Sequence, residues 1–176
     1  GSAYTWSENS QQFRLTPWYN DPVSDRSGEA LYIRDELSGE FWSPAALPAR
    51  GKTPYTCRHG FGYSVFEHKE FGIASEMWVY VAMDAPVKLC RLVVRNESGI
   101  SRHLSLTCYI EPVLGDLRSK TGMHVVTEID TSTGALFSRN PFNTDFPGRI
   151  VFLDANTKIN SFTGDRTEFL GKNGSM

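Results

Sequence analysis

Histidines and cysteines are the side chains that most often hold metals or act as nucleophiles, and this 176-residue chain has four of the former and three of the latter. They are His59, His68, His103, His124, Cys57, Cys90 and Cys108. The histidines lack the HxH and HxxxH spacings, and the cysteines lack the CxxC spacing, so neither set predicts a metal site or a disulfide framework. The sequence also has no GxSxG, GxGxxG or GxxxxGK[ST] pattern. It therefore has no motif for metal, nucleotide or serine-nucleophile chemistry.

Pairs of carboxylates are the second group that could do chemistry, because a glycosidase needs two of them beside one sugar. Asp21 with Asp25, or Asp165 with Glu168, could form such a pair. A chain with 20 acidic residues offers such pairs by chance, and sequence does not give the distance between two carboxyl groups. A complete acid–base site is therefore an alternative that the sequence leaves open.

Strands must position these side chains, because hydrophobic residues recur with a period of two along most of the chain. In residues 72–83, Ile73 and Met77 lie on one face, and Trp78 and Tyr80 lie on the other. The same alternation predicts strands at residues 29–35, 41–44, 87–94, 103–111 and 148–154. Turn residues separate these runs, and no window has a helical stripe. The pattern predicts an all-β fold, an antiparallel β-sandwich.

Three stretches break the alternation. The first is the loop at residues 14–25, which Pro17 and Pro22 stiffen by fixing φ. The second is residues 49–68, where Gly60 and Gly62 are expected to loosen a strand. The third combines residues 138–149 with 161–171. Loops of this kind carry most binding residues in β proteins, so these are the places to look for a site.

Size and charge narrow the classes of function. The length predicts one domain, which we place at residues 4–176, with residues 1–3 as a tail left by cloning. A net charge of −2 gives no electrostatic case for nucleic acid or an anionic membrane surface. The longest apolar run, residues 77–83, is far short of a membrane span. Three cysteines without a pairing pattern favour a reducing compartment. The final residues, GKNGSM, suggest a truncated sandwich cut from a longer protein.

Residues 9–44, NSQQFRLTPWYNDPVSDRSGEALYIRDELSGEFWSP, resemble the start of the sandwich domain of glycoside hydrolase family 94, formerly glycosyltransferase family 36. The resemblance covers the chain from Trp6 onward and continues through YTCRHGFGYSVFEH, GIASEMWVYVAMDAPVKLCRLVVRNESG, RNPFNTDFPGR and SFTGDRTEFLGKNG. The versions TPWYNDPVSD and SFTGDRTEFLG are most similar to the cyclic β-1,2-glucan synthase branch, in its C-terminal region.

This resemblance implies a supersandwich of the galactose-mutarotase-like type, followed in the whole protein by an (α/α)6 barrel. In the family, that barrel carries the general acid and the phosphate site. The resemblance therefore implies that this part is not an enzyme in isolation, needs no cofactor, and shapes the acceptor side of the barrel's active site. The implied partners are a β-glucan oligosaccharide, β-1,2-linked, the barrel of the same protein and a second copy in a homodimer. The implied location is the cytoplasmic face of the bacterial inner membrane, without direct membrane contact.

Two places match loops that reach the acceptor side in the family. Their residues are Trp18, Tyr19, Asn20, Asn140, Asn143, Asp165 and Arg166. An aromatic face can stack on a sugar ring, and amide, carboxylate and guanidinium groups can bond vicinal hydroxyls. The structural alternatives are that Trp18 closes the end of the sandwich and that Arg166 pairs with Asp165 or Glu168.

Three other functions remain as alternatives. The chain could be an autonomous β-glucan-binding module, or the sandwich domain of a cellobiose-type disaccharide phosphorylase. It could also be a small mutarotase-like enzyme, which needs a histidine and a carboxylate facing one pocket. His59 or His68 with Glu67 would supply these groups.

Overall fold

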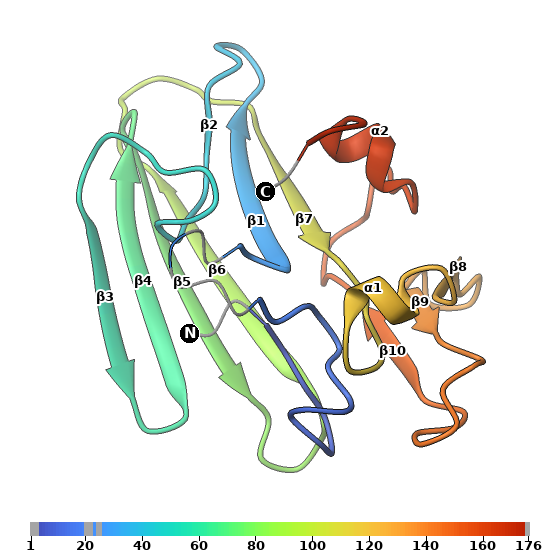
Figure 1. The fold of residues 1–176 in the computed structure, drawn as a ribbon. Helices are drawn as coiled ribbons and strands as arrows, with labels where there is room; N and C mark the ends of the chain where they lie inside the picture. The colour runs from blue at the N-terminus through green and yellow to red at the C-terminus, as the bar shows by residue number, and fades with distance from the viewer. Residues whose placement is uncertain (1–3, 20–22, 24–25, 175–176) are drawn as a thin grey trace. The chain divides into compact units, whose positions relative to one another are not determined.

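The computed structural model describes residues 4–19, 23 and 26–174 (Figure 1). Asn20, Asp21 and Asp25 lie outside the described residues. The chain divides into two compact units, the first built from Glu29–Ile110 and the second from Tyr4–Gly28 with Glu111–Met176. The expectation of a single domain over residues 4–176 stays a prediction.

The first unit contains a four-stranded antiparallel sheet whose strands follow one another in the chain (Figure 1). Its strands are β3 (Tyr55–Gly60), β4 (Tyr63–Glu70), β5 (Ile73–Val81) and β6 (Lys88–Asn96). Met77 of β5 lies between Phe66 of β4 and Leu92 of β6, which places these apolar side chains on one face. Phe71 and Gly72, both with positive φ, form the tight turn between β4 and β5.

A second antiparallel sheet of the first unit has the strand order β2-β1-β7. Its strands are β1 (Glu29–Asp35), β2 (Phe41–Trp42) and β7 (Leu104–Ile110). Ile33 and Trp42 from this sheet and Ile73 from the other are fully buried in one cluster, against which Leu92, Val94 and Leu104 pack. Burying each large side chain contributes roughly 1.5–3 kcal/mol. Because both sheets contribute, the first unit is a sandwich, and the predicted all-β antiparallel fold is confirmed.

Residues 49–68 differ from the prediction of a loosened strand. Gly60 ends β3 and pairs with Tyr63, which begins β4, so Phe61 and Gly62 form the turn of a regular hairpin. Gly62 has φ of 80°, a value that glycine adopts without strain. In sequence, a glycine that turns the chain between two short strands has the same appearance as one that interrupts a single strand.

The second unit has a three-stranded antiparallel sheet of order β10-β9-β8 and two short helices. These elements are β8 (Val126–Ile129), β9 (Leu136–Arg139), β10 (Ile150–Leu153), α1 (Arg118–Thr121) and α2 (Arg166–Leu170). Phe13 stacks on Phe146 with ring centroids 4.7 Å apart, and Val113 and Leu114 are buried. This unit carries six of the seven residues that we expect to contact sugar, and Asn20 is the one outside the described residues.

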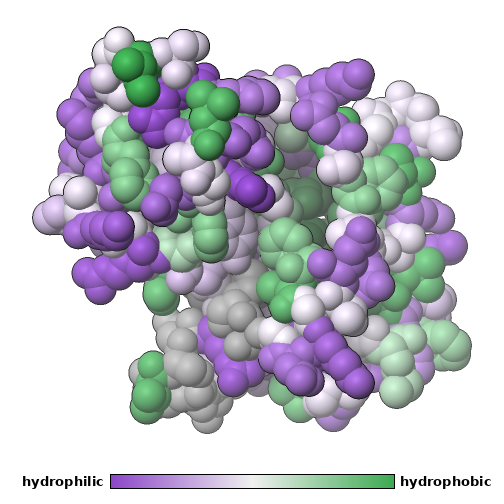
Figure 2. Space-filling model, turned by 90° about the horizontal axis from the view of Figure 1, so that it is seen from above, coloured by the Kyte–Doolittle hydropathy of each residue, from purple (hydrophilic) through white to green (hydrophobic). Residues whose placement is uncertain are grey.

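The described surface is mixed in polarity. On the face seen in Figure 2, hydrophilic and hydrophobic residues are interspersed. In the part of the chain that the structure describes, both helices are far too short to cross a membrane.

Candidate functional site

Glu111, the residue directly after β7, is the centre of a cluster of charged and polar side chains in the second unit. Its side chain is only 11% exposed. Arg118 and Arg166 both direct Nε at its Oε1 atom, Arg166 from 3.2 Å. The Tyr19 hydroxyl donates to Oε2 across 3.5 Å. One carboxylate therefore joins three segments that are far apart in the sequence.

Each arginine of the cluster is the first residue of a short helix, Arg118 of α1 and Arg166 of α2. Asp165 fixes the start of α2, because its Oδ1 accepts a hydrogen bond from the Thr167 backbone N–H at 2.8 Å. Arg166 also donates from Nη2 to the Gly174 carbonyl oxygen at 3.3 Å. These bonds hold the Arg166 guanidinium in one orientation.

The charges around Glu111 keep Tyr19 protonated and leave two arginines partly exposed to solvent. Desolvation and the negative charge of Glu111 raise the pKa of Tyr19, while Arg118, Arg166 and Arg26 oppose this rise. Tyr19 therefore keeps its hydroxyl proton at neutral pH and acts as a donor. The Arg118 and Arg166 side chains are 42% and 38% exposed, so solvent reaches part of each guanidinium. Such an array of donors around an anchored carboxylate suits a ligand rich in hydroxyl groups.

Comparison with known proteins identifies the family. The family model described as the supersandwich domain of glycosyl hydrolase 94 matches residues 1–176. The chain belongs to glycoside hydrolase family 94. The family predicted from the sequence motifs is thus confirmed.

The relatives of this chain include a cyclic glucan synthase and disaccharide phosphorylases. The chain is 41% identical over 177 residues to the cyclic beta-(1,2)-glucan synthase NdvB of Rhizobium meliloti (strain 1021), covering all of the chain and 6% of that protein. It is 25% identical over 175 residues to the N,N'-diacetylchitobiose phosphorylase of Vibrio proteolyticus, covering 96% of the chain and 22% of that protein. It is also 37% identical over 82 residues to the solabiose phosphorylase of Paenibacillus borealis, covering 46% of the chain and 11% of that protein. The chain thus spans less than a quarter of the length of each of these relatives.

Tyr19 and Arg166, two of the residues expected to bind sugar in this family 94 domain, meet at Glu111. Trp18, the residue directly before Tyr19, is 43% exposed. The Arg14 guanidinium lies over the Trp18 ring, 4.8 Å from its centroid, so a cation already occupies one position against the indole. Asn20 lies outside the described residues.

Asn140 and Asn143 lie elsewhere in the second unit, and their amides bond the protein itself. Their Nδ2 atoms both donate to the Leu114 carbonyl oxygen, at 3.2 and 3.0 Å. Their Oδ1 atoms accept backbone N–H groups, including that of Phe142 at 3.1 Å from Asn140 and that of Phe146 at 2.9 Å from Asn143. Leu114 is buried with φ of 50°, a costly conformation for leucine. The two amides therefore support this backbone turn.

Asp165 and Glu168, the candidate catalytic pair that the structure describes, both bond groups close to them in the chain. Asp165 caps α2, and Glu168 accepts a bond from the Thr163 hydroxyl. For the mutarotase-like alternative, Glu67 and His68 are neighbours in β4, so they point to opposite faces of the sheet. Glu67 pairs with the exposed Arg58 at 2.8 Å. These residues do not converge on one pocket.

His68 of the first unit instead forms a buried pair with Glu70, with 3.2 Å between Nε2 and Oε2 and side chains 0% and 4% exposed. The Glu70 carboxylate accepts the backbone N–H groups of Lys52 at 2.8 Å and Thr53 at 3.2 Å. Gly51 lies so close that a Cβ there would be 2.3 Å from Glu70 Oε2. The pair therefore holds the loop that precedes β3.

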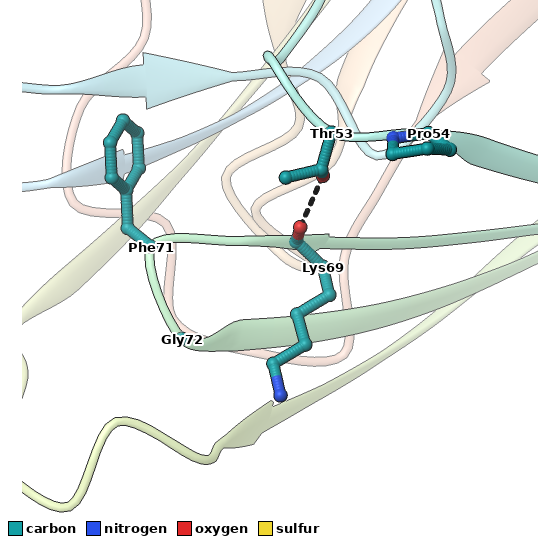
Figure 3. Close-up of a pocket in the computed structure, with 5 residues that line it drawn as sticks. All are labelled: Thr53, Pro54, Lys69, Phe71 and Gly72. Atoms are coloured by element: carbon teal, nitrogen blue, oxygen red, sulfur yellow. Dashed lines mark hydrogen bonds between the residues drawn. The ribbon is translucent and has the colours of Figure 1, made fainter.

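Beside this loop lies a pocket of about 360 Å³, drawn in Figure 3. The Thr53 hydroxyl donates to the Lys69 carbonyl oxygen across it, while the Lys69 side chain points away and pairs with Glu97 at 2.8 Å. The Phe71 ring lies apart from both. Because its polar groups already have partners, this pocket offers few free donors or acceptors to a ligand.

Glu111 and Arg118 are site residues that the sequence does not predict. In the sequence Glu111 is only the end of a predicted strand, and Arg118 lies in a segment without a pattern. Their roles depend on contacts between residues that are far apart in the chain, since Arg166 is 55 positions from Glu111. Across the described ranges, no group of three or more histidine, cysteine, aspartate or glutamate side chains could hold a metal ion.

Proposed function

We propose that this chain is the noncatalytic sandwich domain of a cyclic β-1,2-glucan synthase, and that the Glu111 cluster contributes to the acceptor side of its active site. The observation that carries the proposal is the convergence of Arg118 and Arg166 on one carboxylate while both side chains stay partly exposed. The 41% identity to a cyclic beta-(1,2)-glucan synthase over the whole chain supports this branch of the family.

The chemistry of the cluster fits binding better than catalysis. A glycoside hydrolase or phosphorylase needs a carboxylic acid free to protonate the leaving oxygen. Both oxygens of Glu111 already accept bonds, Oε1 from the arginines and Oε2 from Tyr19. The guanidinium N–H groups that bond none of the described residues are the part of the cluster that a glucan can use, as donors to vicinal hydroxyls.

In this proposal the domain needs no cofactor of its own and works with a helical-barrel catalytic domain of the same protein. Its ligand is a β-1,2-linked glucan oligosaccharide, and a second copy completes a homodimer. Its place is the cytoplasmic face of the bacterial inner membrane. The three free, exposed cysteines fit a reducing compartment.

Substitution of Arg166 by alanine in the full-length protein tests the role of the cluster. Losing one or two hydrogen bonds to neutral hydroxyls costs about 0.5–1.5 kcal/mol each, which corresponds to a rise in KM for the glucan acceptor of about 2- to 150-fold. We expect kcat to stay nearly constant, since the reacting atoms lie elsewhere.

Arg149→Ala is the matched control, because Arg149 also pairs with a glutamate, Glu8, at 2.6 Å in the second unit. It should leave KM unchanged. Equal KM values for the two variants would refute the role of the cluster. A fall in kcat without a change in KM would refute the noncatalytic assignment. Saturable, micromolar binding of β-1,2-glucan by the 176-residue chain alone would instead favour an autonomous binding module.

A further inference from the structure

Three side chains with the elements of a nucleophilic site lie on one face of the β3–β4 hairpin. Cys57 and His59 are two positions apart in β3, so they point to the same face. Ser64 of β4 lies directly opposite His59 in the register. The Cys57 sulphur is 3.2 Å from His59 Nε2, and His59 Nδ1 is 2.9 Å from the Ser64 hydroxyl. The hairpin turn at Phe61 and Gly62 sets this register.

The order of these contacts is that of a nucleophile, a base and an orienting group. When the Ser64 hydroxyl accepts the Nδ1 proton of His59, the lone pair of Nε2 faces the Cys57 thiol. His59 can then take the thiol proton, and the thiolate is the reactive form of cysteine. Phe66, the cross-strand neighbour of Cys57, places its ring edge-on to the His59 ring, with centroids 6.5 Å apart.

Cys57 and His59 are both exposed, so a small reagent can reach the sulphur. Cys90 and Cys108 are exposed as well, but desolvation by the surrounding protein raises the pKa of Cys90 and raises that of Cys108 to about 11. Cys57 thus lies beside a base, whereas the surroundings of Cys90 and Cys108 disfavour loss of the thiol proton. Exposure alone does not distinguish them.

We propose that Cys57 is a redox-modification site, at which a hydroperoxide oxidises the thiol to a sulfenic acid. His59 Nε2 takes the thiol proton, and the sulphur attacks the terminal peroxide oxygen. The S–O bond forms as the O–O bond breaks, and the departing oxygen takes the proton from His59. The sulphur is oxidised and the peroxide is reduced, so thiol and hydroperoxide become sulfenic acid and water or an alcohol. This site shares no residue with the Glu111 cluster and does not depend on the proposed function.

The test treats the full-length protein with hydrogen peroxide at neutral pH and traps sulfenic acid with dimedone. Trypsin releases Cys57 within residues 53–58 and Cys108 within residues 103–118, so mass spectrometry follows the two thiols separately in one sample. We expect Cys57 to be labelled at least about tenfold faster than Cys108, because His59 lies beside its thiol as a base, whereas burial raises the pKa of Cys108. Equal rates at the two cysteines would overturn the proposal without any variant.

Variants then test the role of the base. His59→Gln should slow labelling of Cys57 toward the rate of Cys108, which stays lower because burial raises the Cys108 pKa to about 11. Ser64→Ala should slow it less, because it removes only the orienting group. His124→Gln is the control, since His124 lies in the second unit against Phe142. Tryptophan fluorescence reports whether each variant is folded. An unchanged Cys57 rate in folded His59→Gln would overturn the proposal, as would an equal loss in His124→Gln.

Discussion

Replacing Glu70 by glutamine tests whether the buried carboxylate holds the loop before β3. Its Oε2 atom accepts the backbone N–H groups of Lys52 and Thr53 and faces His68 Nε2. A hydrogen bond to a charged acceptor contributes about 1.5–3 kcal/mol, and one to a neutral acceptor about 0.5–1.5 kcal/mol. Glutamine keeps the shape and removes the charge. Weakening two such bonds should therefore lower the free energy of unfolding by about 2 kcal/mol.

Urea unfolding followed by tryptophan fluorescence measures this loss, because Trp42 is fully buried in the first unit. With a slope of about 1–3 kcal/mol per molar urea, a loss of that size moves the midpoint down by about 1 M. Glu97→Gln is the control. Glu97 pairs with Lys69 where both side chains are about half exposed, so solvent screens the pair and the midpoint should hardly move. Equal midpoints for the two variants would refute the reasoning.

The dependence on pH gives a second check on Glu70. Burial raises the pKa of this carboxyl, but the N–H groups of Thr53 and Lys52, with the charge of His68, lower it more, so the pKa lies below its ordinary 4.5. A depressed pKa stabilises the fold fully above the unfolded value, and this stability is lost as the pH falls through the native value. The gap between wild type and Glu70→Gln should therefore be widest above about pH 5 and shrink in acid. A gap that widens in acid would contradict this assignment.

Two further substitutions test a close backbone approach and a buried hydrogen bond. Gly51→Ala should lower the free energy of unfolding by about 1–3 kcal/mol, because its Cβ would be 2.3 Å from the Glu70 carboxylate, and urea unfolding measures the loss. Asn140→Ala should lower the free energy of unfolding by about 1–3 kcal/mol, because the buried amide bonds the Leu114 carbonyl oxygen. Thermal unfolding measures this loss, and the same substitution at the exposed Asn160 should have little effect. A similar loss in both asparagine variants would contradict the support role.

The strands were largely predictable from the period-two pattern, which is a local property. Ile73 and Met77 are buried on one face of β5, as the alternation predicts. In β7 the alternation places Leu106 and Cys108 together, yet both are exposed while Tyr109, on the other face, is buried. Alternation tells which residues share a face, but burial depends on what packs against that face, which sequence spacing does not contain.

The candidate site was predictable only in part. Tyr19 and Arg166 came from recognisable motifs, and the structure brings them to one carboxylate. The role of Asn140 and Asn143 at Leu114 could not be predicted, because it depends on an unusual backbone conformation of a leucine. An asparagine in a loop has the same appearance in sequence whether its amide binds a ligand or a buried carbonyl.

The pairing of β1 with β7 has a consequence for the order of folding. Asp35 lies opposite Leu104, so the ladder joins segments about 70 residues apart, whereas β3 to β6 pair only with chain neighbours. Local hairpins close at a small entropic cost, so we expect the β3–β6 meander to form first. On a ribosome adding about 5–20 residues per second, β1 waits roughly 4–14 s for its partner strand to be synthesised. During that interval the backbone donors and acceptors on the edge of β1 that pairs with β7 are open to chaperones, or to the same strand of a neighbouring nascent chain.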